Sequence, residues 1–180
     1  MIKNLVFSLT LVLTLFLEAS HAEEIRQELS LNLKVNVLKP VCKLTSGDQT
    51  IYFDDFDALD IVTGSNKIIK STILNFTECS SVKELNITFN QSGQNPSIDK
   101  INNWIPNKIG TNMASGIAVM LLGDNNTPID LGQKIVINVG PSESSKQVSF
   151  KAKVVPTDKA GSGITPGKLE TAVGIEISYE

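Results

Sequence analysis

The feature that most constrains this chain is a repeated alternation of apolar and polar residues in short runs. Residues 29–37 place Leu or Val at every odd position and a polar residue at every even position. Residues 173–179 repeat the alternation with Val, Ile and Tyr. A period of two residues is typical of a strand with one buried face, and no long stretch has the helical period. The sequence therefore predicts an all-β fold.

Turn-forming residues divide the rest of the chain into further candidate strands. Gly, Pro, Asn and Ser are concentrated at 46–48, 93–96, 123–128, 140–141 and 161–167. Between these turns, and together with the two alternating runs, we expect strands at 29–37, 50–53, 68–79, 85–89, 116–122, 129–131, 135–139, 148–155 and 173–179. An acidic loop is expected at 54–60 and one short helix or 3₁₀ turn at 98–104. Strands at this spacing favour an antiparallel sandwich with Greek-key connections.

The first 22 residues have the pattern of a cleaved export signal. Lys3 precedes an apolar run at 5–17, and Ser20 and Ala22 supply small residues before a cleavage point. We expect residues 1–22 to be a signal peptide and the mature chain to begin near Glu23. A retained membrane anchor is the alternative, but the apolar run is short for a bilayer. Export carries the chain to an oxidising compartment.

Composition argues against most catalytic and nucleic-acid functions. The only histidine, His21, lies in the predicted signal peptide, so a mature chain has no imidazole for general-base catalysis or metal binding. The only arginine is Arg26, and the formal net charge is −3. A surface with so little positive charge does not suit a phosphate backbone. We expect no enzyme activity, no cofactor, no metal and no nucleic-acid partner.

The two cysteines, Cys42 and Cys79, each adjoin an apolar run. An even pair of cysteines in an exported chain predicts one disulfide. Two free thiols are the alternative.

The two ends of the mature chain suggest an incomplete sandwich. One alternating apolar strand lies near the mature N-terminus, and another ends at Tyr179. If 173–179 is the sixth strand of an immunoglobulin-like order, the seventh has to come from outside this subunit. The core would then be open along one groove, with exposed apolar side chains and an unpaired strand edge.

Several motifs occur in an order that matches a known family. They are LNLKVNVLKPVC at 31–42, LNFTEC at 74–79, GIAVMLL at 116–122, IDLG at 129–132, and GIEISYE at 174–180 with a penultimate tyrosine. Together they resemble the type 1-like subunits, or pilins, of chaperone–usher fimbriae. The resemblance extends over essentially the whole mature chain.

The resemblance implies an incomplete immunoglobulin-like β-sandwich that lacks its last strand and is completed by donor-strand exchange. Residues 23–37 would be the donor-strand extension, and 38–180 the pilin domain. The side chains expected to enter a neighbour's groove are Leu29, Leu31, Leu33 and Val35; many family members have Gly where this chain has Val35. The residues expected at the acceptor groove and chaperone contact are Val173, Ile175, Ile177, Tyr179 and Glu180.

The implied partners are other pilin subunits, a periplasmic chaperone, an outer-membrane usher and, through the assembled fibre, a host receptor. The implied location is a fimbrium on the cell surface, reached through the periplasm. Two alternative functions stay open: a minor tip or adaptor pilin with its own receptor-binding surface, and a free periplasmic immunoglobulin-like binding domain. A calcium loop at 54–60 and a sugar platform at Trp104 are weaker alternatives.

Overall fold

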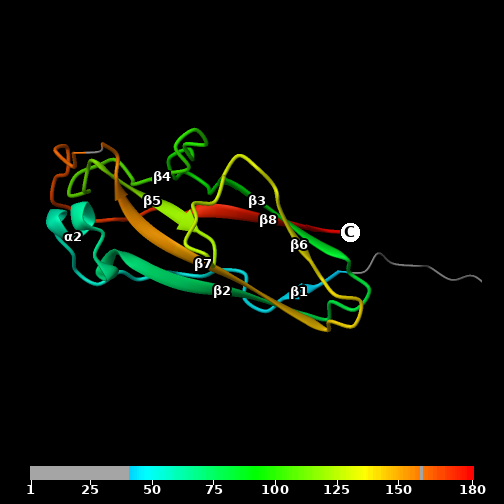
Figure 1. Cartoon of the computed structure of the whole chain (residues 1–180). Helices are drawn as coiled ribbons and strands as arrows, with labels where there is room; N and C mark the ends of the chain where they lie inside the picture. Colours follow the sequence, from blue (N-terminus) through cyan, green and yellow to red (C-terminus); the bar gives the residue numbers. More distant parts are fainter. Residues whose placement is uncertain (1–40, 159) are drawn as a thin grey trace, which may run out of the picture. The chain divides into compact units, whose positions relative to one another are not determined.

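The computed structural model describes residues 41–158 and 160–180, which form an all-β sandwich (Figure 1). Its only α-helix in this part of the chain is short, and no helix there is long and apolar enough to cross a membrane. In chain order the elements are β1 (Lys43–Leu44), α2 (Ala58–Thr63), the 3₁₀ turn η1 (Asn66–Ile68), β2 (Ile69–Thr77), β3 (Glu84–Gln91), β4 (Ile105–Pro106), β5 (Ile117–Leu122), β6 (Ile135–Asn138), β7 (Ser145–Pro156) and β8 (Val173–Tyr179).

The strands form two antiparallel sheets. One has five strands in the order β1-β2-β7-β5-β4, and the other has three in the order β6-β3-β8. The twelve-residue strand β7 pairs with β2 along one edge and with β5 along the other. Its alternate residues Val148, Phe150, Ala152 and Val154 are buried, as the period-two pattern requires. The predicted all-β sandwich is confirmed.

The main core lies between the two sheets. Leu85, Ile87 and Phe89 of the central strand β3 are at most 1% exposed. The ring of Phe89 meets that of Phe150 from the opposite sheet, edge to face, with centroids 6.0 Å apart. Burying one large apolar side chain contributes roughly 1.5–3 kcal/mol. This contact between sheets is therefore a substantial part of what holds the sandwich together.

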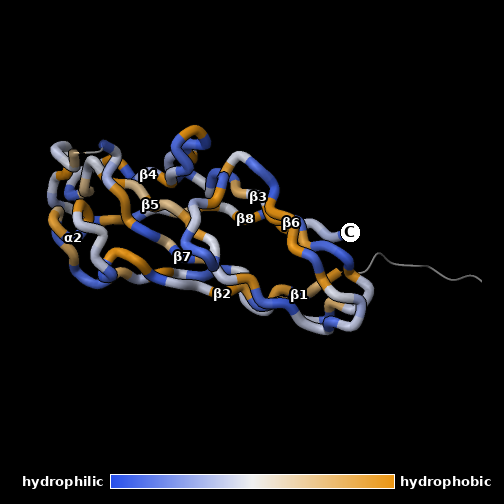
Figure 2. Tube along the Cα trace, in the orientation of Figure 1, coloured by the Kyte–Doolittle hydropathy of each residue, from blue (hydrophilic) through white to orange (hydrophobic). Residues whose placement is uncertain are grey.

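A second, smaller apolar cluster lies beside α2. Ile61 of the helix packs with Ile68, Ala114, Ile117 and Val154. Because Ile117 belongs to β5 and Val154 to β7, the helix covers apolar residues of the five-stranded sheet. Figure 2 shows the hydrophobic colour on part of α2, and also along β6 of the other sheet.

Two predicted strands have no ladder partner. Residues 50–53 are irregular, although Ile51 and Phe53 pack against the core. Residues 129–131 are also irregular, and the N–H of buried Leu131 donates to Oδ1 of Asn103 at 2.9 Å. A side-chain acceptor thus replaces a ladder hydrogen bond there. At both places the alternating apolar residues correctly predicted which side chains are buried, but not that the segment pairs with another strand.

The short helix or 3₁₀ turn predicted at 98–104 does not form, because this segment is a tight turn between two bridged residues. The N–H of Asp99 donates to the carbonyl of Trp104 at 2.8 Å, and the reverse bond is 3.0 Å long. The side chain of Asp99 also accepts from the N–H groups of Ile101 and Asn102. These bonds close the turn within six residues, which leaves no helical ladder.

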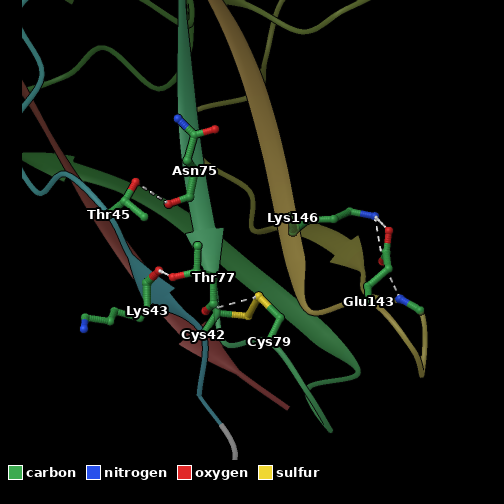
Figure 3. The surroundings of a disulfide bond; sticks show 9 residues. Cys42, Lys43, Thr45, Asn75, Thr77, Cys79, Glu143 and Lys146 are labelled. Carbon is green, nitrogen blue, oxygen red and sulfur yellow. Dashed lines mark hydrogen bonds and ion pairs between the residues drawn. A yellow bond between two sulfur atoms is a disulfide. The ribbon is translucent and has the colours of Figure 1, made fainter.

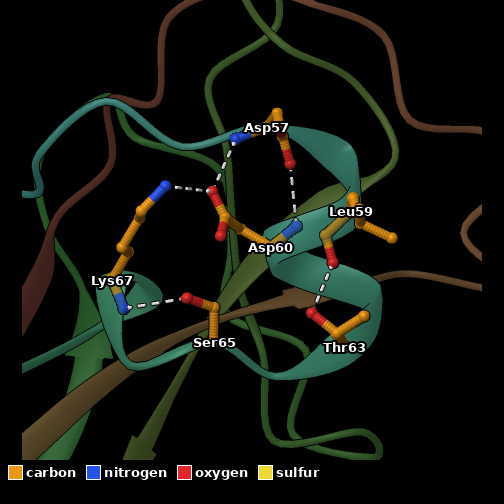
Figure 4. A network of polar contacts seen from close by, with 6 residues as sticks. All are labelled: Asp57, Leu59, Asp60, Thr63, Ser65 and Lys67. Atoms are coloured by element: carbon orange, nitrogen blue, oxygen red, sulfur yellow. Dashed lines mark hydrogen bonds and ion pairs between the residues drawn. The ribbon is translucent and has the colours of Figure 1, made fainter.

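The helix instead begins inside the predicted acidic loop, where Asp57 and Asp60 cap it reciprocally. Oδ1 of Asp57 accepts from the N–H of Asp60 at 2.8 Å, and Oδ2 of Asp60 accepts from the N–H of Asp57 at 3.2 Å (Figure 4). Gly64 ends the helix with φ 71°, a left-handed conformation that glycine adopts without strain. The signal was present in the sequence as two acidic residues three apart, followed by Gly64.

A disulfide joins Cys42 to Cys79, with the Cα atoms 4.3 Å apart, and both side chains are buried. It links the residue before β1 to a residue two positions after the end of β2 (Figure 3). Around it, the hydroxyl of Thr77 donates to the carbonyl of Lys43, and that of Thr45 donates to the carbonyl of Asn75. The covalent bond and these hydrogen bonds hold the two-residue strand β1 on the edge of its sheet.

Replacing both cysteines by serine should destabilise the domain by roughly 3–4 kcal/mol, because the disulfide closes a loop across a sequence separation of 37. Urea unfolding of the two forms measures the difference. Thiol titration of the denatured wild type, without reductant, is the control and should find no free thiol. Equal midpoints for the two forms would contradict the prediction.

Stability should fall on acidification. Donated hydrogen bonds hold the pKa below its ordinary value in six carboxyl groups: Asp54, Asp60, Asp99, Glu143, Asp158 and Glu170. A lowered folded-state pKa stabilises the fold above the unfolded pKa, near about 4, and that contribution disappears as pH falls through the folded pKa. The melting temperature should therefore drop between about pH 5 and pH 2.

Asp60→Asn should make this drop shallower, because the pKa of Asp60 is lowered chiefly by the backbone hydrogen bond from Asp57. Asp48→Asn is the matched control, since Asp48 is an exposed loop residue. A melting temperature that stays flat or rises on acidification would refute the expectation.

Candidate functional site

The strand β8 lies at the edge of the three-stranded sheet (Figure 1, red). It pairs with β3 over seven positions, from Val173 opposite Gln91 to Tyr179 opposite Leu85. On its other side, no strand among residues 41–158 and 160–180 pairs with it. One whole edge of β8 is therefore without a ladder.

The backbone groups on this open edge belong to alternate residues. Just beyond β8, Glu180 and Glu84 exchange two backbone hydrogen bonds of 3.1 Å each. Antiparallel pairs alternate between hydrogen-bonded and non-bonded positions. It follows that the N–H and C=O groups of Ile175, Ile177 and Tyr179 point away from β3. These groups form the row that an added strand would pair with.

The side chains of the same residues point toward the core. Ile175 and Ile177 lie opposite Phe89 and Ile87, and directly opposed residues share one face of a sheet. Their partners on β3 are almost fully buried, yet Ile175 remains 39% exposed. Ile177 and Tyr179 pack against the core and are only half-buried. The core is thus covered on the β3 side and incompletely covered along β8.

Tyr179 has an apolar environment near the end of this edge, and partial burial raises the pKa of its phenol. The next residue, Glu180, is tied to β3 through its backbone. Its carbonyl accepts from the N–H of Lys83 at 2.7 Å and from that of Glu84 at 3.1 Å. The structure therefore brings the predicted acceptor residues onto one strand and its immediate continuation. Their contact with another chain remains a prediction.

A surface hollow lies beside a segment that precedes β8 in the chain. It is lined by residues 51–56 on one side and 167–170 on the other. Ile51, Phe53 and Leu169 pack partly buried against the core, whereas Tyr52 is exposed. Sequence reasoning assigned 50–53 to a strand and so missed this wall of the hollow. The alternation of Ile51 and Phe53 was the available signal.

The other predicted segments are the signal peptide, the donor strand and the acidic segment. The donor residues Leu29, Leu31, Leu33 and Val35, the segment 23–37 and the signal peptide 1–22 lie outside the described residues. Within the described ranges, no group of three or more His, Cys, Asp or Glu side chains could hold a metal ion. In the acidic segment, Asp54 pairs with Lys70 and Asp60 with Lys67.

The chain is similar to known proteins both in sequence and in fold. The family model for fimbrial proteins matches residues 30–180. The crystal structure of the P pilus rod subunit PapA has 13% identity and a TM-score of 0.59, covering 79% of this chain and 100% of that one. A structure of a chaperone–usher pilus that concerns rod uncoiling has 13% identity and a TM-score of 0.62, covering 86% and 97%. At this identity the two structures share the fold.

A search of curated proteins found no match. The family model nevertheless extends over most of the sequence, including every described strand, and the two solved structures have the same sandwich. The chain therefore belongs to the fimbrial protein family.

Proposed function

We propose that this fimbrial protein is a structural subunit of a chaperone–usher fimbria, and that a strand from a neighbouring subunit completes its sandwich beside β8. One observation carries the proposal. Within the part of the chain that the structure describes, Ile175, Ile177 and Tyr179 have backbone groups without a ladder partner on the open edge, and their side chains over the core are incompletely buried. A strand added there would satisfy both deficits.

The energetics favour such an addition. Each new main-chain hydrogen bond contributes about 0.5–1.5 kcal/mol net, and each large apolar side chain that becomes buried contributes roughly 1.5–3 kcal/mol. Alternate residues of the incoming strand would point to the core, as in other cases of β-augmentation. An uncovered edge of this kind is also an aggregation hazard. A protecting partner before assembly is therefore part of the proposal.

The donor is the N-terminal extension of another copy, residues 23–37, with Leu29, Leu31, Leu33 and Val35 entering the groove. Leucine at alternate positions supplies apolar side chains that would cover the partly exposed ones of β8. The hollow between 51–56 and 167–170, which precedes β8 in the chain, would accommodate one end of the donor. Residues 38–180 form the accepting domain.

The proposal includes a chaperone, an usher and a receptor as further partners. A periplasmic chaperone would occupy the edge first and would contact Glu180, and an outer-membrane usher would then export the subunit to the surface. The assembled fibre would carry adhesion to a host receptor. The role is structural, without catalysis. A minor tip or adaptor pilin would also need the β8 edge, whereas a free binding domain would not.

Deleting residues 23–35 of the mature chain should give a subunit that accepts a strand but cannot donate one. It should bind the chaperone and terminate fibres, as measured by co-purification and by fibre length in electron micrographs. Leu31→Asp should act similarly, because an unpaired charge in an apolar pocket costs several kcal/mol. Asn32→Asp is the matched control, since it changes the alternate, water-facing position. If the truncated subunit melts cooperatively as a stable monomer, without chaperone or peptide, the sandwich is already complete and the proposal fails.

A peptide of residues 23–37 should raise the melting temperature of truncated subunit released from chaperone, because a ligand for the native state stabilises it by about 2.7 kcal/mol at 100 times its Kd. Ile175→Asp should abolish this shift. Ile101→Asp should retain it, because Ile101 is 92% exposed on a separate loop. Thermal melts with the peptide and with a scrambled peptide measure the effect. Equal shifts in both variants would place the peptide somewhere other than β8.

A further inference from the structure

A buried amide holds the segment that leads into β8. The residue that follows β4, Asn107, is 6% exposed. Its Nδ2 donates to the carbonyls of Ala114 and Lys168 at 2.8 Å each, and its Oδ1 accepts from the N–H of Glu170 at 2.7 Å. Both donor hydrogens and the acceptor of this amide are therefore used, in the only orientation that satisfies two carbonyls and one N–H.

The backbone beside this amide is closely packed. The N–H of Ala114 donates to the carbonyl of Lys168 at 3.0 Å. A Cβ placed at Gly167 would lie 2.3 Å from the backbone nitrogen of Ala114, so these two segments touch backbone to backbone. The amide of Asn107 thus closes a junction in which neither segment has room to shift.

This junction places one apolar side chain. Leu169 lies between the two residues whose backbone groups Asn107 binds, and it packs against both the main core and the cluster beside α2. It also lines the hollow, in which Ile51 and Phe53 belong to the opposite wall. Lys168 and Glu170, by contrast, are exposed. Leu169 is therefore the apolar part of this wall, and its position depends on polar contacts made by its neighbours.

We propose that Asn107 is a positioning residue for strand acceptance: it fixes Leu169 in the wall of the hollow and thereby strengthens binding of the donor end that enters there. This inference rests on the proposed function. A wall that is already ordered loses little further conformational freedom when the donor arrives. Without the amide, the N–H of Glu170 and the carbonyl of Ala114 lose this partner and the wall loosens. The effect should be confined to one end of the donor.

A double-mutant cycle on fibres of the full chain tests this role. Asn107→Ala is combined in turn with Leu29→Ala and Val35→Ala, at the two ends of the donor set, and with Leu31→Ala in its middle. Sedimentation in guanidinium chloride measures the rate at which fibres release subunits. Asn107→Ala alone should speed release about tenfold. With one end of the donor already substituted, it should speed release less than about twofold, whereas with Leu31→Ala the tenfold effect should persist.

Leu169→Ala is a second variant, because it keeps the hydrogen bonds of Asn107 and removes the side chain that they position. It should couple to the same end of the donor, and it applies also if Asn107→Ala does not fold. Asn103→Gly is the matched control. It removes another amide, which accepts from the N–H of buried Leu131, and glycine tolerates the φ of 59° at this position. Its effect should add independently to every donor substitution.

An equal effect of Asn107→Ala on release with every donor sequence would make its role structural only and would overturn the proposal. Absence of coupling between Leu169→Ala and both donor ends would overturn it as well. Release that is unchanged by Leu29→Ala, Leu31→Ala and Val35→Ala alike would instead reject the proposed function, because the donor strand would not be what holds the fibre together.

Discussion

Among the described residues, the backbone of β8 pairs on one side only, with β3, and the rest of this structure depends on that constraint. Its ladder with β3 holds Ile175, Ile177 and Tyr179 over the core. The same residues direct their N–H and C=O groups to the open edge, where no described strand pairs with them, so one strand combines these polar groups with partly exposed apolar side chains. In water this combination is tolerable only while something covers it. In the assembly that we propose, a chaperone and then the donor strand of another subunit cover this edge.

The other sheet provides the rigidity that such an open edge needs. The long strand β7 pairs along both of its edges, and the aromatic contact between Phe89 and Phe150 joins it to β3. The disulfide between Cys42 and Cys79 holds the first described strand against β2. The core can therefore stay ordered around a flank that is incompletely covered.

Much of the fold could be predicted because the pattern of burial is local. The alternation at 173–179 gave β8 with its bounds, and the apolar run at 116–122 gave β5 to within one residue. Residues 50–53 alternate in the same way, but they pack on the core without pairing. The helix at Ala58–Thr63 was missed because the four aspartates at 54, 55, 57 and 60 suggested a loop, although Asp57 and Asp60 form a capping box. The hollow beside 167–170 depends on contacts that no local pattern reports.

By itself, the sequence determined the all-β class, the identity of the disulfide partners and the apolar residues of the β8 edge. Each of these follows from the chemistry of neighbouring residues or from there being only two cysteines. Only the tertiary structure decided that Glu84 faces Glu180 and that Asn86 is buried beside them. Asn86 and Glu180 are 94 residues apart, and the register that brings them together is set by long-range ladder hydrogen bonds and by packing against the other sheet.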